Sequence, residues 1–226
     1  MKHFTITIGR EFGCNAREIG RQTAAALGVK FYDKELVTLA AKEGGVEKMT
    51  FFAPKEHSGI TDNFQTEFGY GISGMFYSPK AVEAQAGVIR KIAGSENCVM
   101  LGRCSDYFLQ DLNSTLSIFV YAPLSYRVTH ISQAYGLTQK QAQKMIAKID
   151  RKRHRYYKYI TGKNRGDRHG RNLMIDVEKF GVEGAVKIIT DAAKLLFSES
   201  NKYFFDFCGR HFILKVGFLL LKKTSA

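Results

Sequence analysis

The chain has 226 residues and carries 34 lysines and arginines against 21 aspartates and glutamates, a net charge of +13. This length suits one α/β domain with a sizeable core, and a composition that is 45% hydrophobic and 24% charged excludes wholesale disorder. The positive balance favours polyanionic partners, such as nucleotides, nucleic acid or an acidic membrane surface, although a basic surface can also serve solubility alone.

The four cysteines are Cys14, Cys98, Cys104 and Cys208, and none forms a CxxC pair, so the sequence does not predict a zinc site. Cys98 and Cys104 flank a short apolar run and are expected to be small core residues. Nothing at the start of the sequence resembles a secretory leader, so the expected location is a reducing cytoplasm.

The first element is an apolar run at residues 4–8, which predicts a strand, and a helix is predicted at residues 17–27. A strand that feeds a helix N-terminus aims unpaired backbone N–H groups and the positive end of the helix dipole at one point, where anions bind. In a Walker loop this turn reads GxxxxGK[ST]. Here Asn15, Ala16 and Arg17 stand in its Gly-Lys-Ser stretch, so the loop alone is also consistent with a plain strand–turn–helix corner.

Apolar runs alternate with helical patterns along the rest of the chain. Strands are predicted at residues 29–32, 98–101, 116–121 and 173–175, and helices at residues 34–41, 81–93, 124–134, 138–159 and 182–197. Near-continuous apolar strands are typical of a parallel sheet that is buried on both faces. The alternation therefore predicts a doubly wound α/β fold, whose ligands lie at the carboxyl ends of the strands.

Two segments break this alternation. Residues 50–79 are rich in Phe, Gly and Tyr without clear periodicity, and they fit a mobile flap, a substrate-binding insertion or a packed irregular loop. Residues 201–226 are strongly aromatic and aliphatic, and their apolar run is about half the length that spans a bilayer. This tail is expected to pack on the domain or to mediate association, with contact to a membrane surface as a third interpretation.

The predicted strand at residues 98–101 ends in Gly102 and Arg103, at the edge of the sheet where ligands are expected. Arginine offers a planar fork for a phosphate. This favours a phosphate-binding role for Arg103 over a salt bridge to Asp106 or another nearby carboxylate. The last predicted strand leads into Asp176, which can either orient a nucleotide or cap the following helix.

A dense basic segment covers residues 138–171. Thr138 and Gln141 match a capping box at its start. Apolar residues at helical spacing then give it an inner stripe, formed by Ala142, Met145, Ile146 and Ile149. Asp150 and Asp167 are the only acids from residue 139 to residue 171. Cations at this density, interleaved with tyrosines, favour a flap that handles phosphates over a merely solvated face.

Together these features resemble the cytidylate kinase-like family, a branch of the P-loop nucleoside monophosphate kinases, over about residues 4–197. The fragments that carry the resemblance are Arg10-Glu11-Phe12-Gly13, Arg17-Glu18-Ile19-Gly20, Gly102-Arg103-Cys104, Tyr121-Ala122-Pro123-Leu124, Tyr135-Gly136-Leu137 and Tyr156-Tyr157-Lys158. The resemblance implies a three-layer P-loop NTPase-like fold with a five-stranded parallel sheet. It also implies a monophosphate-binding insertion at about residues 50–79 and a helical lid at about residues 138–171, within a domain of residues 1–200.

The resemblance further implies phosphoryl transfer from ATP, with Mg²⁺, to a small acceptor such as CMP. The residues expected to cradle the donor phosphates are Gly13, Cys14, Asn15, Ala16, Arg17 and Glu18. In place of the missing lysine, the catalytic cation is expected from Arg17, Arg151, Arg153 or Arg155. The residues expected on the acceptor side are Asp33, Arg90, Arg103 and Asp176.

The sequence assigns no magnesium ligand, although Glu11, Glu18 and Asp33 are candidates for an anchor. The expected partner is a nucleotide or another phosphorylated small molecule. The absent lysine also fits a nucleotide-binding protein without kinase activity. Nucleic-acid binding through the basic helix and its tyrosines ranks last, because the chain contains no recognised nucleic-acid module.

Overall fold

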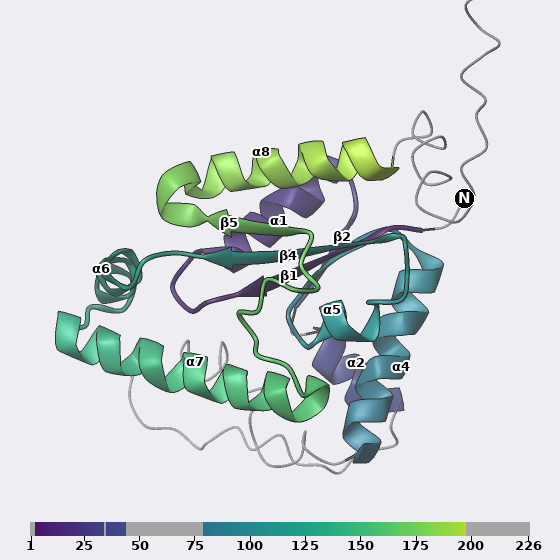
Figure 1. Ribbon diagram of the computed structural model, residues 1–226, viewed down its shortest axis with the longest axis horizontal. Helices are drawn as coiled ribbons and strands as arrows, with labels where there is room; N and C mark the ends of the chain where they lie inside the picture. The colour runs from purple at the N-terminus through teal and green to yellow at the C-terminus, as the bar shows by residue number, and fades with distance from the viewer. Residues whose placement is uncertain (1–2, 34, 44–78, 198–226) are drawn as a thin grey trace, which may run out of the picture.

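Five parallel strands form the central sheet of the computed structural model, which describes residues 3–33, 35–43 and 79–197 (Figure 1). The strands are β1 (Thr5–Arg10), β2 (Lys30–Tyr32), β3 (Cys98–Leu101), β4 (Thr115–Tyr121) and β5 (Leu173–Asp176), in the spatial order β2-β3-β1-β4-β5. β1 lies in the middle, with Ile6 paired to Val99 on one side and to Leu116 on the other. The predicted α/β fold with a five-stranded parallel sheet is confirmed.

Helices cover both faces of this sheet. On one face lie α1 (Ala16–Leu27) and α8 (Val177–Phe197), which pack side by side (Figure 1). On the other face lie α2 (Glu35–Glu43), α4 (Pro79–Ser95) and α5 (Ser105–Phe108). The sheet is thus the middle of three layers.

The buried strands supply two cores because successive side chains point to opposite faces. Ile6 and Ile8 of β1 belong to the core beneath α1 and α8. Cys98 and Met100 of β3 belong to the core on the other face, where they pack with Ile89 of α4. The prediction that Cys98 is a small core residue is confirmed, and the same holds for Cys104.

α6 (Leu124–Tyr135) and α7 (Gln139–Thr161) pack against each other, and α7 lies within the segment at residues 138–171 that is predicted to be a lid. The capping box predicted at the start of α7 is present: Gln141 N–H donates to the Thr138 side chain, and Thr138 N–H donates to Gln141 Oε1. The predicted inner stripe docks on the loop after β1, because its buried members Ala142, Ile146 and Ile149 pack against Phe12 and Ile131. α7 therefore lies directly against the loop after β1.

Two elements differ from the sequence-based expectation. The sequence analysis missed α5, a helix of four residues that directly follows the turn after β3. α8 begins at Val177 rather than at residue 182, because a helical turn precedes Gly181, whose φ of 65° and ψ of −178° are not helical.

The predicted insertion at residues 50–79 lies outside the described residues except for Pro79, the first residue of α4. The tail at residues 201–226 lies outside them entirely. Among the helices that the structure describes, none has both the length and the apolar character that crossing a bilayer requires.

Candidate functional site

The loop between β1 and α1 lines a cavity of about 240 Å³. Gly13 has a φ of 90° and Asn15 a φ of 53°, so the chain passes twice through the left-handed region before α1 begins at Ala16. Glycine adopts this region freely, and asparagine is among the side chains that tolerate it best. These two residues allow the sharp turn that places the N-terminus of α1 at the cavity.

Most backbone N–H groups of this loop have no acceptor among the described residues. The first helical hydrogen bond of α1 runs from Ile19 N–H to the Asn15 carbonyl, at 3.0 Å. The preceding N–H groups that donate to no described atom are those of Gly13, Cys14, Asn15, Ala16 and Glu18. All five residues line the cavity. An anion there would accept these hydrogen bonds and meet the positive end of the helix dipole.

Cys14 contributes its backbone rather than its thiol to this loop. Its Sγ lies 3.0 Å from the Glu11 carbonyl and 3.5 Å from the Val120 carbonyl, to which it donates. Burial raises the pKa of the Cys14 thiol to about 11. The side chain is therefore a neutral packing group at neutral pH.

Arg17, the second residue of α1, is bound to a carboxylate of the protein itself. Its Nε donates to Asp33 Oδ2 at 2.7 Å, and Asp33 is buried just after β2. Such a pair neutralises much of the charge that Arg17 would offer to a phosphate. The structure thus brings Arg17 and Asp33, predicted for the donor and acceptor sides, into one contact.

Arg10, the last residue of β1, also lines the cavity and was not among the residues that the sequence analysis predicted for the site. The pKa of Arg10 is lowered to about 10, mainly by burial, which Asp33 opposes and which nearby Arg103 and Arg165 reinforce. Burial likewise lowers the pKa of Arg103. The available signal was the position of Arg10 at the carboxyl end of the central strand, where ligands of such sheets lie.

Arg153 reaches the same cavity from the lid. It extends from α7 over the ring of Phe12, with 5.6 Å between its guanidinium carbon and the ring centroid. Burial lowers the pKa of Arg153 well below its usual value, and the positive charges of Arg10 and Arg165 act in the same direction. Of the four arginines predicted as catalytic, the structure places Arg17 and Arg153 at the cavity.

The other two predicted catalytic arginines lie elsewhere on α7. Arg151 is exposed and lines a second hollow of about 330 Å³, together with His154 and Arg165. Arg155 is exposed and lines neither hollow.

A network around Asp150 fastens the lid to the loop. Its carboxylate accepts hydrogen bonds from Phe12 N–H at 3.0 Å, from Arg127 Nη1 at 2.7 Å and from Arg165 Nη2 at 2.7 Å. Arg165 Nη1 also donates to the Arg10 carbonyl at 2.6 Å. The sequence analysis assigned no role to Asp150, although its place as an isolated acid in a basic helix was a signal of pairing.

The carboxylates considered as magnesium anchors are all engaged by the protein. Glu11 accepts from Ala122 N–H at 3.3 Å, and Arg127 lies at the same distance. Hydrogen bonds from Arg21 and Gln22 lower the pKa of Glu18 to about 2. The described residues contain no group of three or more His, Cys, Asp or Glu side chains that could hold a metal ion. They therefore do not fit a magnesium ion held by the protein alone.

Two residues predicted for the acceptor side have structural partners instead. Arg90 is exposed on α4, and its Nε donates to the Phe108 carbonyl at 3.3 Å. Asp176 accepts from Glu178 N–H at 3.0 Å and so caps α8. Neither residue lines the cavity.

The salt bridge considered between Arg103 and Asp106 is not formed. Asp106 is bound to Arg171 Nη1 at 2.5 Å and accepts from the Tyr157 hydroxyl at 2.7 Å. Arg171 also lies over the rings of Tyr157 and Phe119. The charge of Asp33 acts instead on Arg103, and that of Arg103 acts on Arg10.

A comparison with protein families agrees with this geometry. The model of the cytidylate kinase-like family matches residues 5–179. The chain belongs to the cytidylate kinase-like family. No curated protein matches the sequence of this cytidylate kinase-like chain.

Several solved structures are similar to this cytidylate kinase-like protein. An uncharacterised protein from Eubacterium ventriosum ATCC 27560 is 23% identical with a TM-score of 0.66, over 85% of this chain and 99% of its own. A gluconokinase from Sinorhizobium meliloti 1021 is 12% identical with a TM-score of 0.48, over 87% and 97%. A shikimate kinase from Bacteroides thetaiotaomicron is 14% identical with a TM-score of 0.46, over 85% and 99%.

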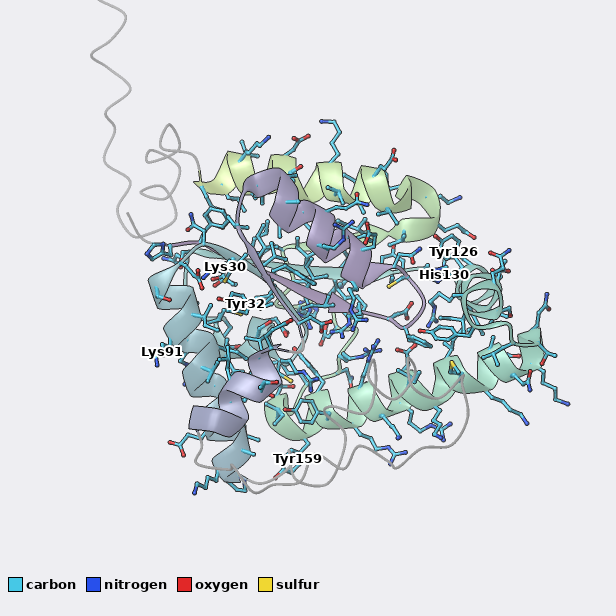
Figure 2. All side chains as sticks on the ribbon, turned by 180° about the vertical axis from the view of Figure 1, so that it is seen from behind. Lys30, Tyr32, Lys91, Tyr126, His130 and Tyr159 are labelled. Carbon is cyan, nitrogen blue, oxygen red and sulfur yellow. The ribbon has the colours of Figure 1, made fainter. Side chains whose placement is uncertain are left out.

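The far wall of the cavity is formed by α6. Figure 2 shows His130 on this helix, at the end of the sheet where the loop after β1 runs. His130 Nδ1 donates to the Gly13 carbonyl at 3.0 Å. Ile131, Ala134 and Tyr135 complete this wall. The cavity of the cytidylate kinase-like domain thus has cations and open amides on one side and a largely apolar wall on the other, an arrangement suited to a nucleotide.

Proposed function

We propose that this protein transfers the γ-phosphoryl group of ATP to a nucleoside monophosphate such as CMP. The observation that carries the proposal is a set of backbone N–H groups without an acceptor among the described residues, on the wall of one cavity with Arg10 and Arg153. These N–H groups belong to Gly13, Cys14, Asn15, Ala16 and Glu18. Open amides at a helix N-terminus are the part of a phosphate loop that does not depend on its lysine. Membership of the cytidylate kinase-like family supports the reaction class.

In the proposed reaction, a phosphate oxygen of the acceptor attacks the γ-phosphorus of ATP. One P–O bond forms, the bond from the γ-phosphorus to the β-bridging oxygen breaks, and ADP leaves with the bonding electrons. Such transfers need positioning and neutralisation of charge rather than covalent help from the protein. The loop amides would hold the donor phosphates, and Arg153 would neutralise charge from the lid side.

Arg103 is proposed to hold the acceptor phosphate. It lies beyond the carboxyl end of β3, and Asp33 is near enough to raise its pKa against the effect of burial. Asp33 is proposed to orient the acceptor while it holds Arg17. Mg²⁺, which the family implies, would come with the phosphates of ATP, because Mg²⁺ is commonly bound through substrate phosphates and water.

The test is a screen of nucleoside monophosphates with MgATP, with ADP release as the readout. The expected result is acceptor-dependent ADP release that is highest with CMP. Arg103→Ala is expected to raise the KM for the acceptor, and Arg153→Ala to lower kcat, each by about 10- to 100-fold, because each removes a charged hydrogen bond. Lys194→Ala removes an exposed charge on α8 and serves as the control. Wild-type kinetics in both arginine variants would contradict these roles.

A nucleotide-binding protein without catalysis is the second candidate. Two observations favour it: Ala16 stands where the lysine is expected, and Arg17 is held by Asp33. Tight binding of ATP, with no ADP release on any monophosphate, would support this candidate over the kinase. Salt-dependent binding of long oligonucleotides, without binding of mononucleotides, would support nucleic-acid binding instead.

A further inference from the structure

Arg10 is a charged side chain at the cavity whose hydrogen-bonding capacity the described protein does not use. It lines the cavity together with the loop at residues 13–18. Its guanidinium donates to no atom of the described residues. Arg17 and Arg153, the other arginines of the cavity, have contacts of their own with Asp33 and Phe12. A guanidinium carries five N–H donors, so Arg10 has donors available for a ligand.

The turn after β3 leaves room for this side chain. A Cβ atom on Gly102 would overlap the guanidinium of Arg10, and Gly102 has a φ of 72°. Both facts make glycine the residue that fits this position. Gly102 N–H also donates to the Ile8 carbonyl at 3.0 Å, which fixes the turn against β1. Arg10 is thereby held between two central strands rather than on a surface loop, a rigid setting suited to a binding group.

The charges around Arg10 do not balance within the protein. Arg103, Arg165 and Arg17 all act on it as like charges, and Asp33 is the opposing charge. That carboxylate is already bound to Arg17 at 2.7 Å. Like charges in a partly buried site repel each other more strongly than in water. A bound polyanion would relieve this repulsion while it accepts hydrogen bonds from Arg10.

We propose that Arg10 supplies, from the end of β1, the cation that a Walker loop takes from its lysine, and that it binds the polyphosphate chain of the donor nucleotide. This inference rests on the proposed function, because it takes the cavity to be the donor site. Arg10, the last residue of β1, would then carry the positive charge that Ala16, at the lysine position of the loop, lacks. Arg10 would then be a catalytic residue that contacts the substrate, whereas Arg17 positions the loop through Asp33.

The test compares the affinity of the full-length chain for MgATP and for inorganic tripolyphosphate by calorimetry. Arg10→Gln is expected to weaken both by about 10- to 100-fold, the effect of losing a charged hydrogen bond. Arg10→Lys keeps the charge and is expected to recover most of this loss. Lys194→Ala removes an exposed charge of α8 that does not line the cavity, and this variant is expected to bind both ligands like the wild type. Binding of CMP is expected to be unchanged in all three variants.

The outcomes separate the two proposals. If the wild type binds neither MgATP nor tripolyphosphate, the proposed function fails and the inference fails with it. If the wild type binds both and Arg10→Gln binds them equally well, the inference alone is overturned. A loss confined to CMP, or an Arg10→Lys variant as weak as Arg10→Gln, also overturns it.

Circular dichroism will show whether Arg10→Gln folds. If it does not fold, NMR of the wild type with ¹⁵N-labelled arginine tests the proposal instead. The Nε–H resonance of Arg10 is assigned as the one that is missing from the spectrum of Arg10→Lys. A shift of that resonance on addition of tripolyphosphate supports the proposal. An unchanged resonance at saturating tripolyphosphate overturns it.

Discussion

The neighbouring strands β1 and β3 each lead into a helix through a turn in the left-handed region. After β1 these residues are Gly13 and Asn15, and after β3 they are Gly102, Arg103 and Cys104. Each turn also buries a cysteine, Cys14 in the first and Cys104 in the second. The two turns therefore share their local geometry at the same edge of the sheet.

The use of the backbone differs between the two turns. After β3, Ser105 N–H donates to the Gly102 carbonyl at 3.1 Å, whereas after β1 the corresponding N–H of Ala16 has no acceptor among the described residues. The helix that follows, α5, has four residues, whereas α1 has 12. After β1, the amides remain open toward a cavity. A strand–turn–helix corner thus becomes a candidate anion site only where its N–H groups are left without acceptors and cations gather around them.

The largest expected effect is a loss of stability on removing Asp106, the acidic residue that follows the second turn. Asp106 holds the buried guanidinium of Arg171, and the two side chains are 8% and 2% exposed. Asp106→Ala leaves that guanidinium without its partner carboxylate and is expected to lower the free energy of unfolding by about 3–5 kcal/mol. Urea denaturation measures this loss.

The matched variant at the first turn is Glu18→Gln. Glu18 is paired with Arg21 on the exposed surface of α1, and exposed pairs contribute little to stability. Its urea midpoint is expected to stay near that of the wild type. Equal losses in Asp106→Ala and Glu18→Gln would contradict the view that the buried pair of Asp106 contributes more to stability than the exposed pair of Glu18.

The next largest expected effect is a loss of stability when Gly13 or Gly102, one glycine from each turn, is replaced by alanine. Gly13→Ala would place a Cβ atom 3.1 Å from Ile131 Cγ1 at a φ of 90°, and Gly102→Ala would press on Arg10 at a φ of 72°. Each is expected to cost about 2–3 kcal/mol of stability, through left-handed strain and crowding. Thermal and urea unfolding measure both.

Gly87→Ala is the control for these variants. Gly87 is an exposed residue of α4 with open space around it, and the substitution is expected to stabilise the helix by about 0.5–1 kcal/mol.

Gly102→Ala is also expected to weaken ATP binding, because it displaces Arg10. Unchanged ATP affinity in a folded Gly102→Ala protein would contradict the link between the second turn and the first.

The smallest effect is on alkaline stability. Burial raises the pKa of Cys14 from 9.0 to about 11, so between these values the folded protein keeps a proton that the unfolded chain has lost. Stability therefore falls as the pH rises from about 9 to 11, by about 2–3 kcal/mol for this group. Cys14→Ala is expected to flatten that part of the curve of unfolding free energy against pH. Parallel curves for the variant and the wild type would show that the thiol ionises as if it were exposed.

The sequence predicted the elements of this fold well, because hydrophobic periodicity reports directly on burial. The apolar stripe of the basic helix appeared as expected, and Ala142, Ile146 and Ile149 are buried. It predicted the candidate site less completely. Arg153 reaches the cavity as expected, but Arg155, two residues further along the same helix, is exposed, and a count of basic residues does not distinguish them.

The roles of Arg10 and Asp150 could not be predicted from the sequence. Their roles depend on partners far away in the chain, such as Gly102 for Arg10 and Phe12 for Asp150. The pairing of Arg17 with Asp33, and of Asp106 with Arg171, also joins different elements. No local pattern identifies which carboxylate neutralises which guanidinium.

By itself, the sequence determined the strand–helix alternation, the parallel sheet, the family and the basic character of the lid. The tertiary structure decided which arginines meet at the cavity, which are neutralised, and which backbone amides stay open. The physical reason is that burial and turn formation follow from the order of residues along the chain, whereas the electrostatics of a site depends on distances between segments that only the folded chain brings together.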